Sequence, residues 1–177
     1  MSGKERTVAL CGNPNCGKTT LFNLLTASNM RVGNRSGVTV ELSAGKWTKD
    51  KSVTIVDTPG ARTLDDGTAD ERVAADFLLS RNADIAVCVI DACNPVAGLC
   101  LAAELAKNEM PFAIALNMWD EAQKGGVKIN VDLLEKLTAK KVFPISAKNN
   151  IGVDELMNFC AKENVRDETR AAFSQNA

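Results

Sequence analysis

The stretch from residue 9 to residue 20 reads ALCGNPNCGKTT and contains the pattern G-x-x-x-x-G-K-T, which is the phosphate-binding P-loop. Residues 7–11 are mostly apolar and predict a buried strand, and residues 19–25 predict a helix. Glycine at positions 12 and 17 lets the backbone wrap tightly with its amide N–H groups pointing inward. The positive N-terminal end of the helix faces the same point. The stretch therefore predicts a site for the phosphates of a nucleotide.

Two side chains of this loop have predicted chemical roles. Lys18 supplies a mobile positive charge for the outer phosphates, and the Thr19 hydroxyl is placed to bind Mg²⁺. A glycine-rich turn that holds no ligand is the alternative, and the flanking strand and helix argue against it. The residues predicted to surround the phosphates are Gly12, Asn13, Pro14, Asn15, Cys16, Gly17, Lys18, Thr19 and Thr20.

The composition excludes several classes of function. The 177 residues, 45% hydrophobic and 24% charged, suit one globular domain, and the net charge of −1 gives no long-range attraction to nucleic acid. The absence of His excludes His-ligated metals and a Ser-His-Asp triad. The 6 Cys form no C-x-x-C pair, and Cys11, Cys88 and Cys160 lie in apolar patterns that predict reduced core residues. No signal peptide opens the chain, and no apolar run reaches the roughly 20 residues of a membrane span.

Strands and helices alternate along the rest of the chain. Apolar runs at residues 84–91 and 111–116 are typical of strands buried on both faces, as in parallel sheets. The two strands around the turn at residues 48–51 predict a hairpin. The sequence therefore predicts an α/β fold, a three-layer sandwich whose six-stranded sheet is mostly parallel with one antiparallel edge strand. Strands are predicted at residues 7–11, 40–47, 52–56, 84–91, 111–116 and 142–145, and helices at residues 19–25, 69–80, 97–108, 121–124, 131–138 and 153–162.

Two segments predict functional loops. Residues 28–40 contain several Gly, Asn and Ser and show no helical period, and residues 61–68 are polar and contain Gly. Long loops without regular structure usually carry function. The loops at the carboxyl ends of parallel strands lie along one edge of the sheet, where ligands bind. The functional candidates of this sequence lie in such loops.

Three further motifs follow strands of the predicted sheet. Asp57 begins the pattern Asp-x-x-Gly, and its carboxylate is suited to hold Mg²⁺ through a water, while the Gly60 amide can bond a γ-phosphate. Asp120 ends the motif Asn117-Met118-Trp119-Asp120. Its carboxylate can accept from both N1–H and N2–H₂ of guanine, whereas adenine would leave it unpaired. Residues 146–148, Ser-Ala-Lys, follow the last strand, where the Ala147 N–H can bond guanine O6.

The order of these motifs over residues 12–148 resembles a small GTPase domain of the translation-factor-related class. Met118 departs from the Lys that such domains have, and it can cover the base without contributing charge. The resemblance implies that GTP or GDP binds to Asn117, Met118, Asp120, Ser146, Ala147 and Lys148, and that Gly37, Val38 and Thr39 form the first switch, with Thr39 as a ligand of Mg²⁺.

The residues within and around these motifs narrow the resemblance to one family. The segments GNPNCGKTTLFN, VGNRSGVTVE, DTPG and NMWDEA resemble the N-terminal cytosolic G domain of the bacterial ferrous-iron transporter FeoB. This resemblance implies a GTP-hydrolysing switch coupled to ferrous-iron uptake through a membrane domain. We expect residues 1–165 to form the GTPase domain and residues 166–177 a polar tail, with the family's helical spacer and membrane domain absent from this chain. The resemblance places the domain at the cytoplasmic face of the bacterial inner membrane, and the chain alone is expected to be soluble.

The hydrolysis mechanism is predicted from a missing side chain. Ala61 follows Gly60, where Ras-like proteins have a water-orienting Gln. By resemblance, Asn15 helps to coordinate K⁺ beside the phosphates, with carbonyls around residues 33–35, so slow, K⁺-stimulated turnover is expected. The catalytic residues predicted on this basis are Asn15, Lys18, Thr39 and Gly60. Arg31 or Arg35 could serve as an arginine finger, or be solvated loop charges.

Other functions remain open from the sequence. A ribosome- or RNA-associated GTPase shares this fold, although the chain shows no basic RNA-binding module and no nucleic-acid partner is expected. A binding module gated by nucleotide, with negligible catalysis, is a second alternative. The two glycine-containing loops would also permit a homo-oligomer, including a domain-swapped dimer.

Overall fold

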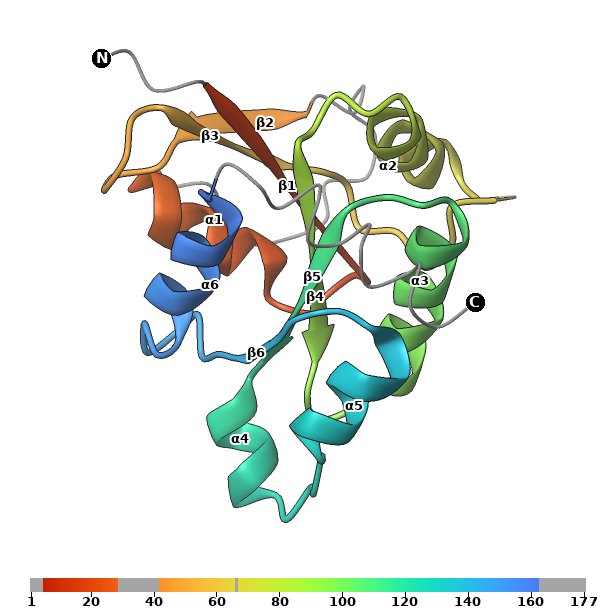
Figure 1. Ribbon diagram of the computed structural model, residues 1–177, viewed down its shortest axis with the longest axis vertical. Coiled ribbons are helices and arrows are strands. Elements are labelled where there is room, and N and C mark those ends of the chain that lie inside the picture. The colour runs from red at the N-terminus through yellow and green to blue at the C-terminus, as the bar shows by residue number, and fades with distance from the viewer. Residues whose placement is uncertain (1–4, 29–41, 66, 163–177) are drawn as a thin grey trace.

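The computed structural model describes residues 5–28, 42–65 and 67–162 (Figure 1). Its centre is a six-stranded sheet in the order β2-β3-β1-β4-β5-β6. All neighbouring strands pair in parallel except β2, which is antiparallel to β3 at one edge. The fold class predicted from the sequence is therefore confirmed. The strands are β1 (Arg6–Gly12), β2 (Ser43–Lys46), β3 (Val53–Asp57), β4 (Ile85–Asp91), β5 (Phe112–Asn117) and β6 (Val142–Pro144).

Helices cover both faces of the sheet, which makes the three layers seen in Figure 1. The core on one face is formed with α1 and α6, and the core on the other face mainly with α2 and α3, against which α4 and α5 pack. Both cores are apolar because β1, β4 and β5 are buried along nearly their whole length. The helices are α1 (Lys18–Thr26), α2 (Ala69–Leu79), α3 (Val96–Lys107), α4 (Trp119–Lys124), α5 (Val131–Thr138) and α6 (Val153–Cys160).

The predicted boundaries differ from the structure mainly at one helix. α4 begins at Trp119, not at residue 121, because Met118 has a left-handed backbone with φ of 58° and turns the chain directly out of β5 into the helix. α6 ends at Cys160 and not at residue 162. Most of the predicted loop at residues 28–40 and the predicted tail at residues 166–177 lie outside the described residues.

The cysteines occupy the positions that the sequence predicts. Cys11, Cys88 and Cys160 are buried in the core as free thiols. Burial raises the pKa of the Cys160 thiol to about 12. Within the described ranges, no group of three or more His, Cys, Asp or Glu side chains is arranged to hold a metal ion. Among the helices described here, none combines the length and the apolar character required to cross a membrane.

Candidate nucleotide site

The predicted motifs meet at one edge of the sheet. The P-loop joins the carboxyl end of β1 to α1, Asp57 is the last residue of β3, Asn117 is the last residue of β5, and Ser146 follows β6. These strands run parallel, so their carboxyl ends lie side by side. This is the position at which ligands bind in open α/β sheets.

The P-loop has the tight backbone that its glycines predict. Gly17 has φ of 86° and caps the N-terminus of α1, and Asn15 is also left-handed with φ of 67°. A Cβ atom on Gly17 would lie 2.2 Å from Nδ2 of Asn117, so only glycine fits between the two loops. The N-terminal N–H groups of α1 therefore open toward the point where the phosphates of a nucleotide are expected.

Lys18 forms a buried ion pair at the centre of the site. Its Nζ donates to Oδ1 of Asp57 and to the carbonyl of Thr58, both at 2.5 Å. Lys18 and Asp57 are each 8% exposed, so each charge depends on the other for stabilisation. The Thr58 hydroxyl donates to the carbonyl of Leu10, which fixes this turn against β1. The structure thus places the lysine predicted for the phosphates on a carboxylate and a carbonyl.

The residues predicted to hold Mg²⁺ fit that ion. The Thr19 hydroxyl donates to Oδ2 of Asp57 at 3.2 Å, so two oxygen ligands of the kind that Mg²⁺ prefers converge. The ammonium group of Lys18 bonds the other oxygen of the same carboxylate, which shows that this position stabilises positive charge. Thr39, the third predicted ligand, lies outside the described residues, as do Gly37 and Val38.

Gly60 lies directly against the P-loop. A Cβ atom at this position would be 3.1 Å from the backbone nitrogen of Pro14, and the next amide, of Ala61, donates to the Gly12 carbonyl at 3.0 Å. Ala61 is fully buried and offers no polar side-chain atom. The structure therefore brings Gly60 against the P-loop, and the bond of its amide to a γ-phosphate stays a prediction.

Two carboxylates fix the segment that follows. Glu104 of α3 accepts from the N–H of Leu64 at 2.5 Å and from the Thr63 hydroxyl at 3.2 Å. Glu71 accepts from the N–H of Arg62 at 2.8 Å and forms a capping box with Thr68 at the start of α2. The N–H of Arg62 is the main cause that lowers the pKa of Glu71. Residues 61–64 are therefore held to the P-loop, α2 and α3.

Asn117 connects the phosphate end of the site to the base end. Its Nδ2 donates to the carbonyl of Cys16 at 2.9 Å, and its Oδ1 accepts from the N–H of Ala147 at 2.9 Å. Asn117 is buried, so both bonds are shielded from water. The Ala147 N–H that the sequence assigns to guanine O6 is thus shared with Asn117, and its contact with the base stays a prediction.

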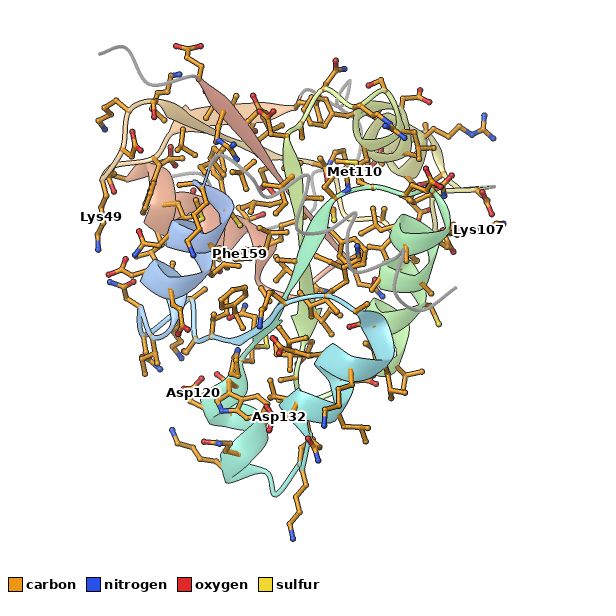
Figure 2. All side chains as sticks on the ribbon, viewed as in Figure 1. Lys49, Lys107, Met110, Asp120, Asp132 and Phe159 are labelled. Atoms are coloured by element: carbon orange, nitrogen blue, oxygen red, sulfur yellow. The ribbon has the colours of Figure 1, made fainter. Side chains whose placement is uncertain are left out.

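Asp120 lies in the first turn of α4 (Figure 2). Oδ2 of its carboxylate accepts from Nδ2 of Asn149 at 2.8 Å. A hydrogen bond from the Ser146 side chain is the largest of the causes that lower the pKa of Asp120. The carboxylate is therefore ionised at neutral pH, as an acceptor for two donors of a base must be.

Three further predicted residues, Met118, Lys148 and Cys16, lie in or next to these motifs. A Cβ atom on Gly17 would lie 3.5 Å from Cε of Met118, so this side chain reaches the P-loop. Lys148 is exposed in the loop after β6, between Ala147 and Asn149. Cys16 is 3% exposed, and burial raises the pKa of its thiol to about 11, which agrees with a space-filling role and not with a reactive thiolate.

Only some of the predicted K⁺ ligands lie within the described residues. Asn15 is exposed in the P-loop, whereas the carbonyls around residues 33–35 lie outside the described ranges. Oδ1 of Asn13 is buried and lacks a hydrogen-bond partner among the described residues. The P-loop therefore presents amide oxygens suited to a cation, without a complete set of ligands in the described part.

Three contacts at the site involve residues that the motifs did not identify. They are the Thr58 carbonyl on Lys18, the Glu104 carboxylate on Leu64, and the Asn149 amide on Asp120. Thr58 lies inside the Asp-x-x-Gly motif at a position that the motif leaves unspecified, and Asn149 directly follows Ser-Ala-Lys, which is a weak signal for a role in the site. Glu104 lies on a helix 40 residues from Leu64 in the chain, and no sequence pattern indicates their contact.

Comparison with known proteins gives one consistent family. The family model described as "Ferrous iron transport protein B" (FeoB_N) matches residues 6–160. The Fe(2+) transporter FeoB of Helicobacter pylori is 40% identical over 174 residues, which cover 98% of this chain and 26% of that protein. The FeoB of Escherichia coli strain K12 is 40% identical over 171 residues, covering 92% of this chain and 22% of the transporter. The chain thus spans about a quarter of the length of these relatives.

Solved structures agree with this result. The crystal structure of NFeoB from S. thermophilus bound to GDP.AlF4⁻ and K⁺ superposes with a TM-score of 0.82 at 44% sequence identity. The match covers 88% of this chain and 61% of that chain. A mutant NFeoB from the same source, bound to GMPPNP, matches equally well, with a TM-score of 0.82, 44% identity and the same coverage of both chains.

Proposed function

Because the chain belongs to the FeoB_N family, described as ferrous iron transport protein B, we propose that it binds GTP and hydrolyses it to GDP and phosphate. The observation that carries this proposal is the position of Asn117, whose side chain ties the P-loop at Cys16 to the base loop at Ala147. One buried side chain thus links the P-loop to the loop whose Asn149 contacts Asp120, the carboxylate suited to guanine. Solved S. thermophilus relatives that bind GMPPNP or GDP.AlF4⁻ support the same function.

Guanine is selected by the Asp120 carboxylate. Two acceptor oxygens match N1–H and N2–H₂ of guanine, whereas adenine presents an acceptor at N1 and would leave the carboxylate unpaired. In Asp120→Asn, one acceptor becomes a donor, which suits the carbonyl at C2 of xanthine. We expect the affinity for GDP to fall roughly hundredfold and that for xanthosine diphosphate to rise. Calorimetric titration with both nucleotides and with ADP measures this exchange, and an unchanged preference for GDP would contradict it.

Hydrolysis depends on positioning and charge neutralisation, which are the main requirements of phosphoryl transfer. Lys18 carries the charge for the outer phosphates, the Gly60 amide bonds the γ-phosphate, and Thr39 senses it from the first switch. Thr19, Asp57 and Thr39 would hold Mg²⁺, which neutralises phosphate charge when bound. Ala61 has no side chain that can orient water, so the attacking water must be aligned by backbone groups, and slow intrinsic turnover is expected.

Asn15 is proposed to hold a K⁺ ion that adds positive charge beside the phosphates. The support is its exposed position in the P-loop and the K⁺ bound by the S. thermophilus relative. Phosphate release from GTP should be about tenfold faster in KCl than in NaCl, and Asn15→Ala should remove that difference. Comparable rates in both salts, with and without the substitution, would refute the role of potassium. Binding of mant-GDP (fluorescently labelled GDP) to both variants shows whether the P-loop itself is intact.

The whole protein is proposed to use this hydrolysis in ferrous-iron uptake. The support is that the curated relatives, of which this chain matches about a quarter, are Fe(2+) transporters. In this proposal the G domain acts at the cytoplasmic face of the inner membrane, with the membrane domain of its own protein as partner. Uptake of ⁵⁵Fe²⁺ by cells that carry the full-length protein tests the coupling. Lys18→Ala should abolish uptake, whereas unimpaired uptake would separate iron transport from GTP binding.

A further inference from the structure

Asn149 makes a side-chain contact with the base-reading carboxylate. Its Nδ2 lies 2.8 Å from Oδ2 of Asp120, although the two residues are 29 positions apart and belong to different loops. The bond joins the loop after β6 to the first turn of α4. It therefore couples the two segments between which the base is expected to bind.

The fold fixes Asn149 in this position. Ser146 and Ile151 exchange two backbone hydrogen bonds, each of 3.0 Å, and so join the two ends of the loop formed by residues 147–150. Asn150 takes a left-handed backbone with φ of 53°, which completes the turn. The Ala147 N–H is bonded to Asn117 at the other side of the same loop. Asn149 is thus presented to Asp120 by a loop that is anchored at both ends.

The contact leaves room on Asp120 for a base. An ionised carboxylate offers about four lone-pair sites, so one bond from Asn149 leaves acceptor sites on both oxygens. The Ser146 side chain also lowers the pKa of this carboxylate, which keeps it ionised and able to accept. Holding a side chain in its binding orientation before the ligand arrives lowers the entropy cost of binding. Asn149 is therefore placed to orient Asp120 without competing with the base.

We propose that Asn149 is a specificity-determining positioning residue, which holds the Asp120 carboxylate in the plane that accepts both donors of guanine. This proposal rests on the guanine-binding function proposed above. The role of Asn149 can be tested by comparing guanine with hypoxanthine, which has N1–H but no amino group at C2. A rotated carboxylate can still accept a single bond from hypoxanthine, whereas the paired bonds to guanine need both oxygens in one plane. Loss of Asn149 should therefore weaken the binding of GDP more than the binding of inosine diphosphate (IDP).

The test compares Asn149→Ala with the control Asn150→Gly. The control removes the neighbouring side chain of the same loop, and glycine suits the left-handed backbone there. Affinities for GDP, IDP and ADP are measured by calorimetry on the whole chain. In Asn149→Ala, GDP affinity should fall about fivefold, the effect of one hydrogen bond, and IDP affinity less than about twofold. Asn150→Gly should keep the wild-type ratio of GDP to IDP affinity.

Three results would overturn the proposal. Equal losses for GDP and IDP in Asn149→Ala would mean that the residue only stabilises the loop. Tighter GDP binding would mean that Asn149 competes with guanine for Asp120. The same change of ratio in Asn150→Gly would assign the effect to loop order. A wild-type chain that does not prefer GDP to ADP would instead refute the guanine-binding function itself.

Discussion

The two ends of the proposed nucleotide site are built in different ways. At the phosphate end, the groups predicted to bind the ligand bond one another: Lys18 bonds Asp57, and Thr19 bonds the same carboxylate. At the base end, Asp120 is held by Asn149, a residue outside the predicted motifs, and keeps acceptor sites for a base. Binding at the phosphate end must therefore exchange existing contacts, whereas the base end is oriented in advance. We infer that the phosphate end governs affinity and its dependence on Mg²⁺, and that the base end governs selectivity.

The largest effect on nucleotide affinity is expected from Lys18→Ala, which removes contacts at the phosphate end and leaves the base end unchanged. The substitution removes the charge meant for the phosphates and leaves Asp57 buried without its cation. Affinity for mant-GDP should fall roughly hundredfold, while the preference for guanine over adenine persists in the residual binding. Fluorescence titration, with unlabelled GDP and ADP as competitors, measures both quantities.

Lys49→Ala is the matched control. Lys49 is paired with Asp154 at 2.6 Å, but both side chains are more than half exposed, and Lys49 lies before the start of β3, at the opposite end of that strand from Asp57. Its removal should leave nucleotide affinity unchanged. Comparable losses in the two variants would show that the effect of Lys18 is not specific to the site.

A smaller loss of GDP affinity, together with a loss of guanine selectivity, is expected from Gly17→Ala, because this position contacts both ends of the site. The new Cβ atom would lie 2.2 Å from Nδ2 of Asn117, and alanine at φ of 86° is strained. The displacement of Asn117 should reduce the free energy of unfolding by about 2–4 kcal/mol and weaken GDP affinity and guanine selectivity together. Urea denaturation and calorimetry provide the two measurements.

Gly126→Ala separates backbone strain from the clash. Gly126 has φ of 76°, and a Cβ atom there would have no neighbour within 4 Å. This control should lose only about 1 kcal/mol of unfolding free energy and keep its selectivity. If Gly17→Ala behaved in the same way, Asn117 would not be the link between the two ends.

The smallest effect is expected from Glu104→Ala, which loosens the segment after Gly60. The variant loses the acceptor for Leu64 N–H and the Thr63 hydroxyl, which should cost about 1 kcal/mol of unfolding free energy and speed amide exchange at Leu64. Glu104→Gln keeps an acceptor oxygen and should restore most of this stability. Selectivity for GDP over ADP should not change, and a change would contradict the independence of the two ends.

The sequence predicts the fold well because its signals are local. The apolar runs of β4 and β5 and the glycine pattern around the P-loop depend on residues that are neighbours in the chain. The start of α4 is not predicted because it depends on one left-handed residue, Met118, whose conformation no periodicity indicates. Local patterns thus determine which elements form, and single backbone angles determine where they begin.

The candidate site is predicted less completely than the fold. The motifs identify Lys18, Asp57 and Asp120 because phosphate, Mg²⁺ and guanine require particular groups after particular strands. They do not identify Asn149 or Glu104, because each acts through a contact between segments far apart in the chain. They also do not show that Lys18 and Asp57 bond each other, since both are assigned to ligands. Such contacts follow from tertiary packing, which motif spacing does not describe.

The most direct test is a pair of crystal structures of this chain, grown without nucleotide and with GMPPNP and Mg²⁺. The account predicts that Lys18 leaves Oδ1 of Asp57 when the nucleotide is present, while Asn149 stays within hydrogen-bond distance of Asp120 in both crystals. Lys18 remaining on Asp57 beside the bound nucleotide, or Asn149 separating from Asp120 as the base binds, would contradict it.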